Sequence, residues 1–86
     1  MRALFVGGTV DNVEVEIDGS EPPVHYPPQT GSGQPRYRLQ LVGRKDDQVV
    51  CAVYGAPDVA AETVRDTAEQ RDYARRFSAQ LADAAA

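Results

Sequence analysis

The sequence contains no tryptophan, one cysteine, and no apolar run long enough to cross a membrane. The single thiol of Cys51 excludes an internal disulfide and cannot build a zinc site alone. Small secreted domains usually carry several disulfides, so their absence favours a reducing compartment and a cytoplasmic location. Residues 1–6 form too short an apolar run for a signal peptide.

Positive charge is also scarce. Nine Lys and Arg residues stand against thirteen Asp and Glu residues, which gives a formal net charge of −4. An acidic chain lacks the basic field that general binding to a phosphate backbone requires. At 86 residues we expect one domain with a thin core. Because aromatic residues are few, we expect that core to consist mainly of Val, Leu, Ile and Ala.

Two strands are expected near the start of the chain. Residues 2–6 are an apolar run ended by two glycines, which indicates a strand covered on both faces. Residues 13–18 alternate with period two, which predicts a strand with one buried face and one solvated acidic face. The two sets of side chains are Val13, Val15 and Ile17, opposite Glu14, Glu16 and Asp18.

Two further strands are expected at residues 36–42 and 49–54, and as neighbours in sequence they should form a hairpin. The second is continuously apolar, as in strands buried on both faces. The first alternates, with Tyr37, Leu39 and Leu41 opposite Arg36, Arg38 and Gln40. If it lies beside residues 13–18, Glu14 and Glu16 face Arg36 and Arg38 across the ladder, which is a prediction of strand order.

Residues 19–35 form a long connection rich in proline and glycine. Five of the six prolines lie here, and proline excludes both a helix and a central strand. We expect an extended loop whose residues 24–26 pair with a sheet edge. A stiff proline segment binds with little loss of entropy, so this loop is a candidate docking motif that presents Val24, His25 and Tyr26. The alternative is a loop that lies across the sheet without a binding role.

Residues 58–82 contain no glycine or proline and are rich in Ala, Glu, Gln and Arg, which predicts one C-terminal helix. Arg71 and Arg75 fall within the extended apolar arc of this helix. We therefore expect their charged ends to reach past the core, or the helix to bend or fray there. The apolar arc consists of Val59, Thr63, Thr67, Ala74, Phe77 and Leu81.

Together these patterns predict an α+β fold over residues 1–86: a small antiparallel sheet of three to four main strands, with one C-terminal α-helix packed on one face. The expected core residues are Leu4, Val6, Val13, Val15, Ile17, Leu39, Leu41, Val49, Cys51, Val53, Phe77 and Leu81.

We find no cluster with a catalytic, cofactor-binding or metal-binding signature. His25, the one histidine, has no predictable partner for acid–base chemistry. Cys51 lies in the most apolar strand, where a thiol acts as a small hydrophobic group. The acidic residues of 11–18 lack the spacing of a calcium loop. The one basic patch expected from the sequence consists of Arg36, Arg38, Arg44 and Lys45.

The chain resembles short phage and prophage proteins of unknown function. The resemblance lies in Leu4-Phe5-Val6-Gly7-Gly8 with Asp11 at the following turn, then Tyr37-Arg38-Leu39 and Val53-Tyr54. Asn12 stands where the family pattern has a glycine. The resemblance implies an accessory protein of viral origin and supplies no activity or catalytic residue.

We therefore expect a small non-enzymatic protein-binding or adaptor protein, either a monomer or a homodimer, without a cofactor. The residues expected to contact a partner are Val24, His25, Tyr26, Glu14, Glu16, Arg36 and Arg38. One alternative is a small enzyme or enzyme subunit that uses His25 with a carboxylate. A further alternative is weak nucleic-acid binding through the basic patch.

Overall fold

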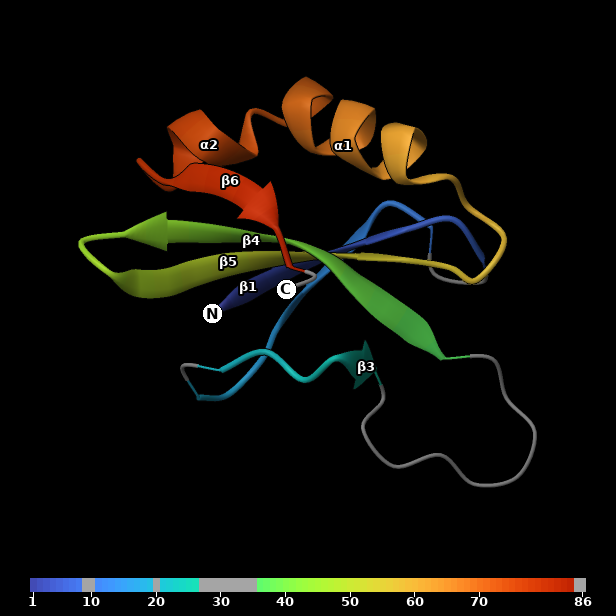
Figure 1. Cartoon of the computed structure of the whole chain (residues 1–86), viewed down its shortest axis with the longest axis horizontal. Helices are drawn as coiled ribbons and strands as arrows, with labels where there is room; N and C mark the ends of the chain where they lie inside the picture. Colours follow the sequence, from blue (N-terminus) through green and yellow to red (C-terminus); the bar gives the residue numbers. More distant parts are fainter. Residues whose placement is uncertain (9–10, 20, 27–35, 85–86) are drawn as a thin grey trace.

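The computed structural model describes residues 1–8, 11–19, 21–26 and 36–84, and it confirms a small α+β fold. Figure 1 shows α1 and α2 above a curled sheet and the segment that leads into β3 below it. The elements are β1 (Arg2–Val6), β2 (Val13–Glu16), β3 (His25–Tyr26), β4 (Tyr37–Lys45), β5 (Gln48–Gly55), α1 (Ala61–Gln70), α2 (Tyr73–Arg76) and β6 (Gln80–Asp83).

The sheet is mixed, whereas the sequence patterns predicted an antiparallel one. Its strand order is β2-β1-β5-β4-β3, with β6 also paired to β4. β1 runs parallel to β5, and the other recorded pairs are antiparallel. The predicted contact between residues 13–18 and 36–42 is wrong, because β1 and β5 separate β2 from β4. Residues 17–19 and 21–26 pass below the sheet to its far edge instead of returning beside β2 (Figure 1).

The hairpin of β4 and β5 is present as expected. Asp46 and Asp47 connect the strands, and both have positive φ angles, 52° and 66°. A two-residue connection with two positive φ angles matches the right-handed twist of paired strands. β5 lies in the middle of the sheet, and its apolar run is buried on both faces, as the sequence predicted.

β4 carries a register shift between Leu39 and Leu41. An extra residue in one strand of a pair reverses the faces of the side chains that follow it. As a result Leu39 and Leu41, predicted to share a face, pack into different cores. The first half of β4 therefore contributes to one core, and the second half contributes to the other.

The helix-side core lies between the sheet and the helices. It consists of Leu4, Val6, Leu41, Cys51, Val53, Val64, Ala68 and Tyr73.

The tyrosine-side core lies on the other face of the sheet, and it is aromatic where aliphatic residues were expected. Three tyrosine rings surround Phe5, one stacked, one tilted and one edge-on, with centroids 5.0 to 5.2 Å from that of Phe5. Tyr37 donates a hydrogen bond to the Gly7 carbonyl, so its polar end is satisfied although the ring is buried. The buried members are Ala3, Phe5, Ile17, Tyr37, Ala52, Tyr54 and Ala56.

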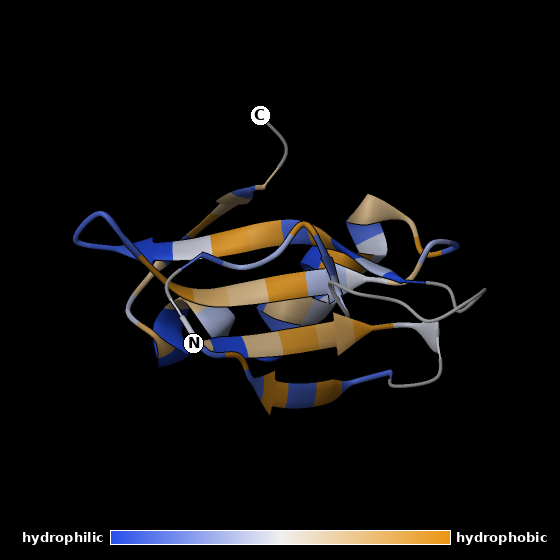
Figure 2. Ribbon diagram, turned by 90° about the horizontal axis from the view of Figure 1, so that it is seen from below, coloured by the Kyte–Doolittle hydropathy of each residue, from blue (hydrophilic) through white to orange (hydrophobic). Residues whose placement is uncertain are grey.

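Val13, expected in the core, is 39% exposed on the edge strand β2. Figure 2 shows apolar and polar residues alternating along this strand. The apolar face of this strand is not covered at Val13, so the alternating pattern alone predicted more burial than the structure has.

The predicted helix over residues 58–82 is interrupted. α1 ends at Gln70, Asp72 adopts a left-handed conformation, α2 is one short turn, and residues 80–83 form a strand. Of the two alternatives expected near Arg71, the structure therefore shows the irregularity of the helix. The buried face of α1 consists of Val64 and Ala68 rather than the predicted arc with Thr63 and Thr67. β6 pairs with β4, which overrides the helix preference of its sequence.

Gly43 lies where β4 passes Cys51, and it offers a test of this packing. A β-carbon at Gly43 would clash with the Sγ atom of Cys51 and crowd Leu81. We expect Gly43→Ala to lower the free energy of unfolding by about 1–3 kcal/mol in urea denaturation. The double variant Gly43→Ala/Cys51→Ala should recover part of that loss, because it removes the clashing sulfur. Simple addition of the two single effects would contradict the proposed contact.

Candidate functional site

Two candidate regions of the sequence meet at the edge of the sheet. β3 pairs with the start of β4, which sets His25 opposite Arg38 and Tyr26 opposite Tyr37. The Leu39 amide also donates a hydrogen bond of 2.8 Å to the Val24 carbonyl. Residues 24–26 of the proline-rich segment and Arg38 of β4 are therefore neighbours, a proximity that sequence spacing did not predict.

Exposure differs among these residues. Val24 is 58% exposed, and it and Val13 are the exposed large hydrophobic residues of the described chain. His25, Arg36 and Arg38 are also exposed. Val24, His25, Arg36 and Arg38 form what we call the docking edge. Tyr26 does not belong to it, because its ring packs 5.1 Å from Phe5, measured between centroids.

Tyr54 holds the docking edge in place from the core. Its ring is fully buried, and its hydroxyl donates a hydrogen bond of 2.7 Å to the Pro23 carbonyl. Burial, with a smaller contribution from Tyr26, raises the pKa of Tyr54 to about 12, so it remains a protonated donor at neutral pH. Sequence reasoning missed this role, because a continuously apolar strand does not indicate which carbonyl a buried hydroxyl reaches.

A hollow of about 340 Å³ lies beside the docking edge. The Arg65 guanidinium, from α1, bonds the Asp83 carboxylate, from β6, at 2.6 Å. The residues that line this hollow are Arg38, Leu39, Gln40, Ala61, Arg65 and Asp83.

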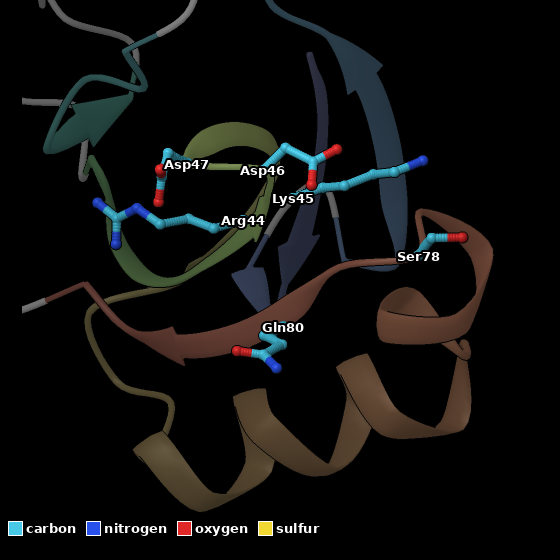
Figure 3. Close-up of a pocket in the computed structure, with 6 residues that line it drawn as sticks. All are labelled: Arg44, Lys45, Asp46, Asp47, Ser78 and Gln80. Carbon is cyan, nitrogen blue, oxygen red and sulfur yellow. The ribbon is translucent and has the colours of Figure 1, made fainter.

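A second hollow, of about 510 Å³, lies at the other end of β4. Its side chains are spread around the rim and do not converge on one point (Figure 3). Arg44 and Lys45 lie here beside the acidic turn of Asp46 and Asp47. At about 3.3 Å per strand residue, they are roughly 20–30 Å from Arg36 and Arg38. The four predicted basic residues therefore do not form one patch.

Glu14 lies away from the docking edge, in a cluster of three arginines. Its carboxylate is bonded by Arg71 at 2.6 Å, by Arg76 at 3.1 Å and by Arg2 at 3.4 Å. The Glu14 side chain is only 12% exposed, so the predicted solvated acidic face is wrong at this position. The hydrogen bond from Arg76 is the main reason that the pKa of Glu14 falls to about 2.

The Tyr73 hydroxyl lies next to this cluster. It is buried and makes no hydrogen bond of good geometry among the described residues, although it is close enough to Glu14 to contribute to the lowered pKa. Burial, followed by the neighbouring carboxylate, raises the pKa of Tyr73.

Glu16 differs from Glu14. It is 65% exposed and forms an ion pair with the Met1 ammonium at 2.9 Å.

The described residues offer little for metal or covalent chemistry. Within the described part of the chain, no three His, Cys, Asp or Glu side chains are grouped to hold a metal ion. Cys51 is fully buried in the helix-side core, and burial raises the pKa of its thiol, which lowers its reactivity. None of the described helices is long and apolar enough to cross a membrane.

The Glu14 cluster predicts a specific acid sensitivity. The pKa of Glu14 is about 2 in the folded protein and 4.5 in the unfolded chain, so its stabilisation is complete above about pH 5 and is lost as pH falls towards 2. We expect Glu14→Gln to lower the free energy of unfolding at pH 7 by about 1–3 kcal/mol. This range allows for the screening of the partly exposed arginines by solvent.

Urea unfolding from pH 7 to pH 2 measures this effect, with Glu16→Gln as the matched control. The control should change stability by less than about 0.5 kcal/mol, because Glu16 is mainly in solvent. The difference between wild type and Glu14→Gln should shrink below pH 5. A difference that stays constant down to pH 2 would show that the Glu14 charge is not responsible.

Comparison with known proteins adds no assignment to this geometry: no family model, curated protein or solved structure matches the chain.

Proposed function

We propose that the chain is a small non-enzymatic protein-binding protein that uses the docking edge to occupy a partner's surface. The observation that carries the proposal is the 58% exposure of Val24 beside His25, Arg36 and Arg38. Exposed apolar groups with flanking charge are typical of contact sites, in which a buried anchor provides affinity and the charged rim provides orientation.

The way in which the edge is held supports this proposal. Val24 accepts a hydrogen bond from Leu39, and Pro23 accepts one from the buried Tyr54. A segment fixed in this way loses little conformational entropy when a partner binds. The same exposed valine in a free loop would contribute less to affinity.

Neither alternative expected from the sequence receives comparable support. His25 is exposed and, in the part of the chain that the structure describes, lines neither of the two hollows above, so neither hollow places a substrate against it. The basic residues expected to bind nucleic acid are divided between the two ends of β4. Continuous phosphate contacts need a continuous basic surface.

The cellular setting is also a proposal. From the resemblance carried by Leu4-Phe5-Val6-Gly7-Gly8 we propose a phage or prophage accessory role. The lone cysteine favours the cytoplasm, where thiols stay reduced.

Val24→Ser tests the docking edge. We expect it to reduce capture of a stoichiometric partner from host lysate by about ten-fold, because it removes an apolar anchor from the interface. Quantitative mass spectrometry of tagged protein measures the loss. Val13→Ser is the matched control, since Val13 is the other exposed valine and lies on the opposite edge of the sheet.

The control variant should retain the partner, and both variants should keep the wild-type unfolding midpoint. Full capture by Val24→Ser would remove the docking edge from consideration. Equal loss in both variants would indicate a general effect on the fold rather than a contact at β3.

A further inference from the structure

The hollow beside the docking edge is lined by residues of three elements, β4, α1 and β6. β4 carries its register shift between Leu39 and Leu41 at this place. α1 begins only at Ala61, and β6 ends at Asp83. Arg38 from the strand and Arg65 from the helix both line the space left between them.

The charge in this hollow is opposite to the charge of the whole chain. Two arginines and one aspartate line it, in a chain with a formal net charge of −4. Within the described residues, no hydrogen bond or ion pair engages the Arg38 guanidinium. A guanidinium with all its donors free, on the wall of a hollow, can bind a carboxylate through two parallel hydrogen bonds.

The chain already places a carboxylate in this hollow. Asp83 accepts a hydrogen bond of 2.6 Å from Arg65. The amide of Ala84, the next residue, donates a hydrogen bond of 2.9 Å to the Gln40 carbonyl. The ion pair is largely exposed, and exposed pairs contribute only about 0–1 kcal/mol. Arg65 can therefore exchange Asp83 for another carboxylate at little cost.

We propose that this hollow binds an Asp or Glu side chain of an acidic segment of the partner protein, held between Arg38 and Arg65 in competition with Asp83. The inference rests on the proposed function and names the chemistry of its partner. A carboxylate fits better than a phosphate, because the nearby Asp83 repels a doubly charged group more strongly. A nucleic acid would need further basic contacts along its backbone.

A capped tetraglutamate peptide is the probe, titrated into isotope-labelled full-length protein at low salt. We expect amide chemical shift changes at Arg38, Gln40, Ala61 and Arg65. Arg38→Gln and Arg65→Gln should each weaken binding about five-fold, the loss expected for one charged hydrogen bond at a partly exposed site. Arg75→Gln is the matched control, because Arg75 is exposed on α2 and does not line the hollow.

Asp83→Asn provides the most specific readout. It frees Arg65 and removes the competing negative charge, so we expect peptide binding to strengthen about three-fold. A general screening effect or a damaged fold would not strengthen binding. Weaker binding by Asp83→Asn, or no shift at the four residues, would overturn the proposal. Tighter binding of inorganic phosphate or of an oligothymidylate than of the peptide would also overturn it.

The two proposals fail separately. If the peptide does not bind but Val24→Ser still loses the captured partner, the docking edge stands and the carboxylate site is rejected. If the peptide binds as expected but Val24→Ser keeps the partner, the carboxylate site stands and the docking edge is rejected.

Discussion

The register shift between Leu39 and Leu41 is the constraint on which the two-sided arrangement depends. One extra residue lets β4 contribute first to the tyrosine-side core and then to the helix-side core. It also divides the outer edge of β4 between two partners, β3 at the beginning and β6 at the end. The docking edge and the hollow beside it lie where these two partners separate.

The Glu14 cluster is a second constraint, and it ties the edge strand β2 to the helices. Glu14 projects from the edge strand β2 and is bonded by Arg71 and Arg76, which lie on either side of the helix break. The left-handed Asp72 between them redirects the chain so that both guanidinium groups reach one carboxylate. The same geometry explains why Arg71 is tolerated within an apolar arc: the helix stops there, and its guanidinium reaches the Glu14 carboxylate.

Local patterns predicted the elements better than their partners. The apolar run of β5 and the alternation of β2 identified strands, since burial on one or two faces sets the period of a strand. The parallel pairing of β1 with β5 joins two segments that lie far apart in the sequence, which no local pattern encodes. β6 was missed because Gln80–Asp83 prefers a helix in isolation, and pairing with β4 overrides that preference. At the site, the sequence identified Val24 and Arg38 individually. Their proximity and the roles of Tyr54 and Arg65 could be recognised only from the folded structure.

The distribution of aromatic residues makes the protein its own spectroscopic reporter. Without tryptophan, near-ultraviolet absorption and emission come mainly from four tyrosines. Three of them contact Phe5 below the sheet, while Tyr73 packs edge-on against Phe77 above it. Replacing Tyr73 with phenylalanine would leave optical signals from the lower layer alone. Comparing that signal with the helical circular dichroism of α1 would reveal whether the two layers melt as one cooperative unit or in succession.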